Sequence, residues 1–298
     1  MVGVFSIPIL FAATVLSWGA SWIAIKYQLG IVPIQVSLIY RFGIAALIII
    51  LWSFLRGYRL KFSYKEHLQM AIMGLFLFCI NYYLFYKATF HLVTGLIAIL
   101  FSSVVILNIL NGKIFFGKAI SPIVLCGGII GIFGLCIIFF KDLVDFNFTN
   151  STSIALALCI AGSMSASIGQ LLSQKNQSKG LPVFQTAGIS MLYGITYMTI
   201  FALLEKEKFI FDFSYSYISS LVFLVIFASV IGWWSFLTLI GKLGADRAAY
   251  VTLLMPIVSL LISTYWEDFQ WSLNDYLGVG MVLFGNLLIM RRKKVRYI

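Results

Sequence analysis

Long apolar runs follow one another along nearly the whole of this sequence, with only short polar breaks between them. Each run has about 18 to 23 residues, which is about the length that a helix needs to cross a hydrocarbon core of about 30 Å. Inside lipid such a run must be helical, because every backbone N–H and C=O needs a partner within its own segment. The runs predict ten membrane-spanning helices, at 4–25, 34–55, 68–87, 93–112, 121–140, 153–173, 184–204, 218–240, 247–266 and 273–290.

The composition agrees with a chain that is surrounded by lipid. Hydrophobic residues make up 61% of the sequence and charged residues only 10%, and the mean hydropathy is +1.02. A soluble globular domain has about 45–50% apolar and about 25% charged residues. We therefore predict an all-α integral membrane protein.

The basic residues predict how the chain is oriented. Cytoplasmic loops of membrane proteins carry an excess of Lys and Arg. With the N-terminus inside, only Lys26, Lys87, Lys141, Lys206 and Lys208 of the 21 Lys and Arg fall on the outer side, and Arg41 falls within a span. Both termini are thus expected in the cytoplasm. Distributed in this way, the net charge of +11 indicates topology and contact with the lipid bilayer, not a nucleic-acid partner.

The two halves of the sequence share landmarks at a nearly constant offset. "KYQLGIVP" at 26–33 is echoed by "KNQSKGLP" at 175–182, and Tyr82 with Tyr83 aligns with Trp233 and Trp234. Gly127 and Gly134, which are seven positions apart, likewise align with Gly278 and Gly285. Three such landmarks in one order indicate a duplication. We predict a first repeat at 1–145, a second at 146–291 and a basic tail at 292–298. Five spans in each repeat make the second copy inverted, an architecture that can present one central site to either side of the membrane.

Three further motifs stand out: "WGASWIAIK" at 18–26, "TGLIAILFSS" at 94–103 and "RAAYVTLLMPIVSLL" at 247–261. With these motifs and the repeated landmarks, the whole chain resembles the drug/metabolite transporter superfamily, in particular its ten-helix EamA-type permeases. The resemblance implies that helices one to four and six to nine enclose a central substrate cavity. It also implies that helices five and ten lie together at the edge, and that the protein exports small metabolites without a cofactor.

The chain departs from the family pattern at two places. Gly117 is followed by Lys118 where the family usually has Gly-Glu. Ser102 and Ser103 stand near the place where a proline often breaks the fourth helix, whereas Pro256 is kept in the ninth. A helix break is therefore expected in the second half with better support than in the first.

Glycines recur on one face of the fifth and tenth spans. They are Gly127, Gly131 and Gly134 in one span, and Gly278 and Gly285 in the other. Small residues allow close approach of neighbouring helices in membranes. We expect these faces to pack helices within a monomer, with a homodimer through them as the alternative.

Polar side chains form stripes on three spans of the second half. Positions i, i+4 and i+7 share one face of a helix. The stripes consist of Ser163, Ser167, Gln170 and Gln174 in the sixth span, Thr186, Ser190, Tyr193 and Tyr197 in the seventh, and Thr252, Ser259 and Ser263 in the ninth. Polar stripes in lipid should face protein or water, so they predict the substrate path. The alternative is hydrogen bonding between helices.

Aromatic and amide side chains provide the corresponding candidates in the first half, together with Trp233 in the second. A few amides beside aromatic faces suit a small amphipathic organic molecule, although aromatic residues also gather at membrane interfaces. The candidates are Trp18, Ser21 and Trp22 in the first span, Asn81, Tyr82 and Tyr86 in the third, and Ser102 and Asn108 in the fourth.

Arg41 lies about seven residues inside the second predicted span, away from the span ends and the loops where the other basic residues lie. A central Arg costs about 2.5–3.5 kcal/mol on insertion scales, so something should compensate it. Its planar fork could bind a substrate carboxylate. It could equally snorkel or bind a structural partner, and the sequence leaves both readings open.

No Asp or Glu falls in the middle of a predicted span. An intramembrane proton relay through carboxylates is therefore not expected, and we predict facilitated movement or exchange. His67 and His91 fall on opposite sides of the membrane, which argues against a shared metal site and against an enzyme. The family resemblance, together with Arg41 and the aromatic residues, implies a carrier in the inner cell membrane that exports amino acids or related carboxylates. A membrane scaffold or receptor of the same fold is the alternative.

Overall fold

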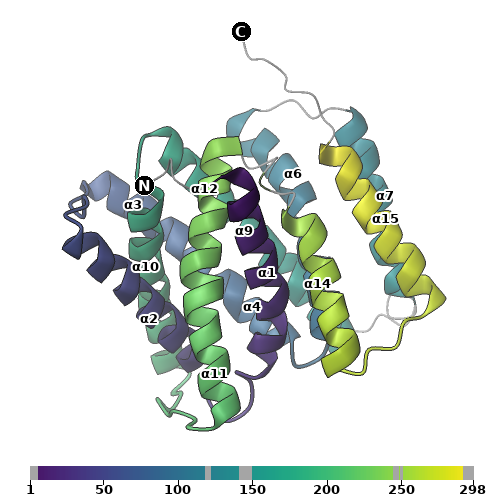
Figure 1. Ribbon diagram of the computed structural model, residues 1–298, viewed down its shortest axis with the longest axis horizontal. Helices are drawn as coiled ribbons and strands as arrows, with labels where there is room; N and C mark the ends of the chain where they lie inside the picture. Colours follow the sequence, from purple (N-terminus) through teal and green to yellow (C-terminus); the bar gives the residue numbers. More distant parts are fainter. Residues whose placement is uncertain (1–5, 118–121, 141–149, 244–247, 249–250, 291–298) are drawn as a thin grey trace.

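The protein is a bundle of helices that run up and down along a common direction (Figure 1). Its computed structural model describes residues 6–117, 122–140, 150–243, 248 and 251–290, and this part contains no strand. The predicted repeat boundary at 145/146 and the predicted tail at 292–298 lie outside the described residues. The first half of the bundle comprises α1 (Ile7–Lys26), α2 (Ile34–Leu55), α3 (Tyr64–Gly74), η1 (Leu75–Ile80), α4 (Asn81–Ala88), α5 (Thr94–Ser102), α6 (Val104–Phe116) and α7 (Pro122–Ile138). The second comprises α9 (Ser151–Ser178), α10 (Val183–Leu204), α11 (Tyr215–Phe223), η2 (Leu224–Gly232), α12 (Trp233–Leu243), α14 (Val251–Trp266) and α15 (Leu273–Met290).

The helices suit a membrane in length and in surface. Seven helical segments of the described chain are long and apolar enough to cross a bilayer, and two further apolar helices, Cys126–Ile138 and Leu254–Trp266, are shorter. Large hydrophobic side chains remain exposed on many helices, as with Leu47, Leu203 and Phe133. Such a surface is expected where lipid replaces water. The prediction of an all-α membrane protein is confirmed, whereas the count of ten crossings stays a prediction.

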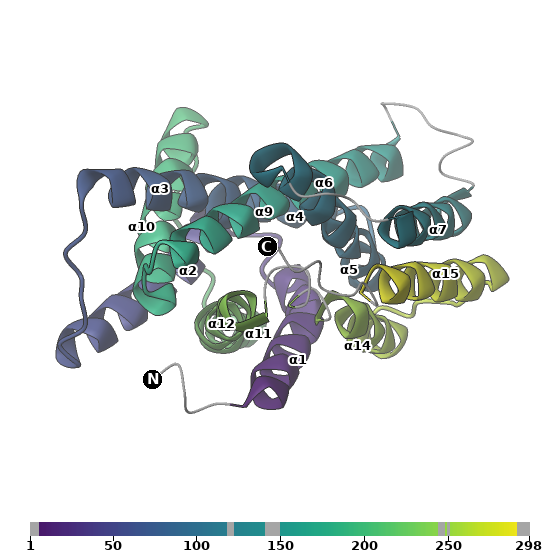
Figure 2. The same ribbon diagram turned by 90° about the horizontal axis from the view of Figure 1, so that it is seen from above.

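Two helices stand apart from the main bundle. Seen from above, α7 and α15 lie side by side at one edge (Figure 2). A Cβ added to Gly134 would lie 2.6 Å from the carbonyl oxygen of Gly278, and one added to Gly285 would meet the carbonyl of Gly127. The predicted glycine faces thus bring two helices of one chain into backbone contact.

Two long helical segments change to π-helical geometry halfway along. The π-helical segment η1 connects α3 to α4, and η2 connects α11 to α12. In a π-helix the backbone bonds run to i+5, and such segments are frequent at functional sites. Carbonyls of both segments accept side-chain hydrogen bonds, Phe76 from Ser165 and Ala228 from Trp18. Sequence periodicity did not predict either segment.

The helix break lies in the half where the sequence made it less expected. The chain turns at Ser103 between α5 and α6, where its N–H bonds to the Leu100 carbonyl and the Ser102 hydroxyl donates to the Ile99 carbonyl. Pro256, by contrast, lies inside the continuous helix α14. Serine side chains that compete for backbone carbonyls can bend a helix without a proline.

Candidate functional site

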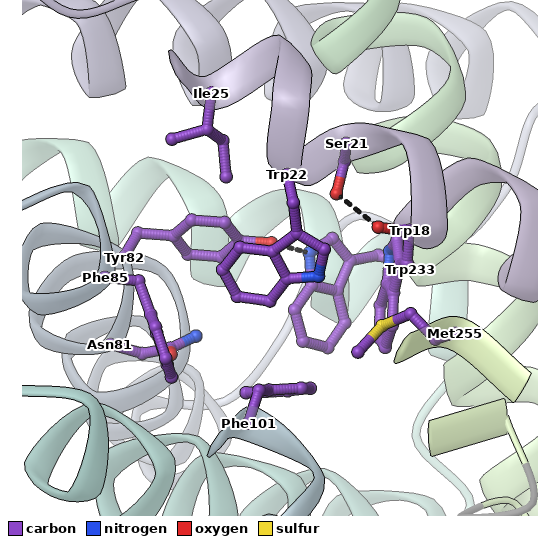
Figure 3. Close-up of a pocket in the computed structure, with 10 residues that line it drawn as sticks. All are labelled: Trp18, Ser21, Trp22, Ile25, Asn81, Tyr82, Phe85, Phe101, Trp233 and Met255. Carbon is purple, nitrogen blue, oxygen red and sulfur yellow. Dashed lines mark hydrogen bonds between the residues drawn. The ribbon is translucent and has the colours of Figure 1, made fainter. Parts of the chain in front are cut away.

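A narrow cavity of about 30 Å³ lies between α1, α4, α5, α12 and α14. Six of the predicted site residues line it, namely Trp18, Ser21, Trp22, Asn81, Tyr82 and Trp233 (Figure 3). Four residues that the sequence analysis missed also line it: Ile25, Phe85, Phe101 and Met255. Helical spacing could have found two of them, because Ile25 follows Trp18 by seven positions and Phe85 follows Asn81 by four.

Aromatic rings form most of the cavity wall. The ring centroids of Trp18 and Trp233 are 4.7 Å apart, and the Trp22 ring packs against Phe85 at 5.3 Å and Phe101 at 5.8 Å. These are tilted and edge-on arrangements at the distances that aromatic pairs prefer. No charged side chain is among the residues that line the cavity. The site is therefore an apolar box with few polar groups.

The indole N–H groups of the three tryptophans differ in their partners. Trp18 donates to the Ala228 carbonyl at 3.1 Å, and Trp233 donates to the Tyr82 hydroxyl at 2.8 Å. The buried Nε1 of Trp22 has no protein partner. An unsatisfied buried donor at a cavity wall is an unusual feature that calls for an explanation.

Asn81 presents the complementary unsatisfied group. Its side-chain nitrogen donates to the Leu77 carbonyl at 3.2 Å, whereas its buried Oδ1 has no partner. The bond to a carbonyl, which can only accept, fixes which amide atom is the nitrogen. The cavity wall thus contains one free donor and one free acceptor.

Arg41 lies behind the cavity wall and does not line it. Its side chain is 1% exposed. It donates to the Ser229 hydroxyl at 2.9 Å and to the Tyr86 hydroxyl at 3.3 Å, and its guanidinium lies 4.7 Å from the centroid of the Tyr82 ring. No carboxylate in the described part of the chain forms a salt bridge with it. Its positive charge is held by neutral groups next to the aromatic box.

The predicted stripe on α9 faces α6. Gln170 accepts a hydrogen bond from Asn108 at 2.8 Å, and Ser167 accepts one from Asn111 at 2.9 Å. Ser163 is buried with a hydroxyl that has no partner. These contacts are hydrogen bonds between two helices, which is the alternative interpretation that the sequence left open for this stripe.

The remaining predicted site residues lie away from the central cavity. Ser259 donates to the Thr94 carbonyl at 3.5 Å. Tyr193 bonds to His67 in a groove between α3 and α10, and Tyr197 is half-buried against the core. Thr252 belongs to α14, but its side chain is outside the described part of the structure.

One end of the bundle, where α1 and α14 finish and α5 begins, is closed by polar contacts around Glu267. The Glu267 side chain has no solvent exposure and pairs with Lys26 at 2.9 Å. Its second oxygen accepts from the Thr94 N–H at 2.9 Å and from the Ser263 hydroxyl at 2.6 Å. Burial by itself raises the pKa of Glu267, but the hydrogen bonds from Lys26, Ser263 and Thr94 outweigh it, and the pKa lies below its ordinary value.

The opposite end, where α9 and α12 finish and α10 begins, contains a wider cavity of about 440 Å³. Ser178, Gly180 and Gly241 line it and are exposed, so this vestibule reaches the surface. Gln174 and Thr238 also line it, and each has a buried oxygen without a partner. Ser235 and Gln170, which lie deeper on α12 and α9, carry further unpartnered atoms. Unpartnered polar atoms therefore occur both at the vestibule and deeper on α9 and α12.

Comparisons with known proteins agree with this architecture. The model of the EamA-like transporter family matches residues 5–140 and 153–291. An uncharacterized transporter of Archaeoglobus fulgidus is 26% identical over 96% of this chain and 99% of its own length. A protein of Escherichia coli named "probable amino-acid metabolite efflux pump" is 23% identical over 93% of this chain and 92% of its own. A protein crystal structure of the same fold superposes with a TM-score of 0.70 at 16% identity, covering 94% of both chains.

Proposed function

Because the chain belongs to the EamA-like transporter family, we propose that it is a carrier that exports small organic metabolites by alternating access. Amino acids or related carboxylates are the substrate class that we propose. The proposal places the protein in the inner cell membrane with both termini in the cytoplasm, so that the vestibule opens to the cytoplasm and the Glu267 contacts close the outer side.

The contrast between the two ends of the bundle carries the proposal. The outer end is tied together by a buried carboxylate, while the inner end contains a vestibule of about 440 Å³. The central cavity between them has only about 30 Å³, and one water molecule requires about 10–15 Å³ on this measure. An organic substrate can therefore enter only if the helices around the cavity move apart. A site that opens to one side at a time is the defining feature of alternating access.

The inverted repeat that we propose is supported by equivalent positions in the structure. Pro33 and Pro182, which end the two repeated octapeptides, directly precede α2 and α10. The π-helical segments begin at Leu75 and Leu224, which are separated by the same 149 positions as the octapeptides. The close contact of Gly134 with Gly278 is matched by that of Gly127 with Gly285. Helices related in this way can exchange conformations between the two halves.

The substrate class is supported by charge and by one relative. Arg41 is a buried positive charge next to the cavity, and no described carboxylate neutralises it. A positive field favours a substrate with negative charge. The similar Escherichia coli protein is named for amino-acid metabolites. The carboxylates of the described residues lie at helix ends, as Glu205 and Glu267 do, so we propose exchange or facilitated movement without proton coupling.

Counterflow in proteoliposomes tests the proposal. Vesicles that contain purified protein are preloaded with millimolar L-amino acids and diluted into a trace of the labelled compounds. A carrier concentrates label transiently inside, because unlabelled substrate leaves as labelled substrate enters, whereas a pore only equilibrates it. Protein-free vesicles are the control. Absence of counterflow for every amino acid and related carboxylate would reject the proposed substrate class, and equal rates with and without a pH gradient would support the absence of proton coupling.

A further inference from the structure

Two residues that line the central cavity each have a buried polar atom without a hydrogen-bond partner. The Trp22 side chain is buried to 93% and that of Asn81 to 97%, since they are 7% and 3% exposed. The indole N–H of Trp22 and the side-chain oxygen of Asn81 are both without a protein partner. Both residues line the same space of about 30 Å³. A buried polar group that stays unsatisfied costs about 1–3 kcal/mol.

The other polar groups of the cavity each have at least one partner. The indole nitrogens of Trp18 and Trp233 donate to Ala228 and Tyr82, and the Ser21 hydroxyl donates to the Trp18 carbonyl. The hydroxyls of Tyr82 and Ser21 keep further hydrogen-bonding capacity, but among the lining residues only the Trp22 N–H and the Asn81 oxygen have no partner. A ligand therefore meets this donor, this acceptor and a set of aromatic faces. An indole N–H can only donate, and an amide oxygen can only accept. A ligand must offer an acceptor to the first and a donor to the second.

The charge next to the cavity limits the form of that donor. The Arg41 guanidinium lies 4.7 Å from the ring centroid of Tyr82, whose side chain lines the cavity. Aromatic boxes bind cations well when nothing opposes them. Here a positive charge without a described counter-ion lies behind the wall, so an ammonium group is disfavoured and the donor should be neutral.

Resting on the carrier function above, and restricting its substrate class to compounds that place no ammonium group against this wall, we propose that the cavity recognises a ring-bearing group with one acceptor and one neutral donor. A carboxamide on an aromatic ring is the simplest example of this class. Trp22 donates to the carbonyl oxygen of the ligand, and Asn81 accepts from its N–H. The ring lies against Phe85 and Phe101, which already pack against Trp22. Helix movements that widen the cavity provide the space for the ring.

A matched set of probes tests this recognition. Benzamide and acetophenone have the same shape and the same carbonyl, but only benzamide has an N–H donor, and benzylammonium has a charged donor. Binding of each labelled compound to purified protein is measured by equilibrium dialysis, with protein-free micelles as the blank. We expect benzamide to bind about tenfold more tightly than acetophenone, because the analogue leaves the Asn81 oxygen unpaired. Benzylammonium should bind most weakly.

Two substitutions separate the two roles. Asn81→Leu should bring the ratio of acetophenone to benzamide Kd to about one, whereas Asn111→Leu, the same change in an α6–α9 contact, should keep it. Trp22→Phe should weaken both probes by about fivefold or more, while Trp271→Phe, whose N–H donates to Thr264 outside the cavity, should weaken neither. The ratio is read within each variant, so it stays informative if one variant is poorly folded.

The outcomes distinguish this proposal from the carrier function. Equal affinity for benzamide and acetophenone in the unmodified protein, a ratio that survives Asn81→Leu, or tightest binding of benzylammonium would each overturn the recognition. If counterflow occurs and the ratio does not respond to Asn81→Leu, the carrier function survives and the recognition fails. If the ratio responds but no counterflow occurs with any substrate, the binding site survives and the carrier function fails.

Discussion

The indole N–H of Trp233 donates to the hydroxyl of Tyr82 at 2.8 Å, and these two residues are 151 positions apart in the sequence. That separation is the same as the offset at which the two halves of the chain align around these residues and around their glycines. In an inverted repeat, equivalent residues that touch each other must lie near the axis that relates the halves. The bond therefore places the central cavity between the two proposed repeats, where a carrier of this architecture is expected to bind its substrate.

Replacing either partner of this bond should destabilise the protein, and the effects of the two replacements should not be additive. Tyr82→Phe leaves the buried N–H of Trp233 unpaired and should cost about 1–3 kcal/mol of the free energy of unfolding. Trp233→Phe removes the donor and also part of the ring packing against Trp18. In a double-mutant cycle the pair should cost less than the sum of the single changes by about 1 kcal/mol. Denaturant unfolding of all four proteins in detergent measures this difference, and strict additivity would contradict an energetically coupled bond.

Arg41 should not tolerate replacement by lysine. Its planar group donates to Ser229 and Tyr86 and lies over the Tyr82 ring, a combination of contacts that a single ammonium cannot reproduce. We expect Arg41→Lys to lower the counterflow rate by about tenfold, which corresponds to about 1.4 kcal/mol. The matched control is Arg56→Lys, since Arg56 also lies over an aromatic ring, that of Trp52, but at the exposed end of α2. Similar rates for both variants would show that the buried contacts of Arg41 do not matter for transport.

How far the sequence predicts this molecule differs between the fold and the site. The helix positions follow from the length of the apolar runs, which is a local property of the sequence. The edge pairing of α7 with α15 follows from the family resemblance and from the small-residue faces of the two helices. Six cavity residues were predicted because each has a polar side-chain atom, which stands out in an apolar span. Ile25 and Phe85 were missed although they share a helix face with predicted residues. Phe101 and Met255 were missed because an apolar side chain facing a cavity has the same sequence signal as one facing lipid or core. The π-helical segments and the partners of Arg41 depend on contacts between distant segments, which periodicity does not contain.

The contacts around Glu267 should act as a closure that must open during transport. Lys26 and Glu267 join the end of α1 to the end of α14. In a background without the four native cysteines, we expect a bifunctional thiol reagent added to Lys26→Cys, Glu267→Cys protein to abolish counterflow. A reductant that cleaves the cross-link should restore it. Each single cysteine variant treated in the same way is the control. Full transport activity with the cross-link in place would contradict a moving closure at this end.

Acidification should weaken the same closure. The pKa of Glu267 is lowered in the closed structure by its hydrogen-bond donors, although burial opposes them. A carboxyl with a lowered pKa stabilises the closed form above its ordinary pKa, and this contribution is lost as the pH falls through the lowered value. We expect a cysteine introduced at Ile25 to react relatively faster with an impermeant thiol reagent from the outer side below about pH 4.5, when its rate is divided by that of a small free thiol at the same pH, because the thiolate fraction itself changes with pH. This ratio should not change between about pH 6 and 8. Glu267→Gln in the same cysteine-substituted protein should react faster at all of these pH values and lose the pH dependence. An unchanged dependence would show that another group titrates.

Two glycines on one helix should respond to alanine in opposite directions. A Cβ at Gly278 would lie 2.6 Å from the Gly134 carbonyl oxygen, whereas a Cβ at Gly280 would meet nothing within 4 Å. Gly278→Ala must push α15 away from α7, and we expect it to lower the free energy of unfolding by about 1–3 kcal/mol. Gly280→Ala only adds helix propensity and should raise it by up to about 1 kcal/mol. Both substitutions add the same methyl group to α15, so a difference in sign can come only from the contact between the helices. Thermal unfolding followed by circular dichroism measures it, and equal shifts in Tm would mean that the glycine face does not set how closely α7 and α15 pack.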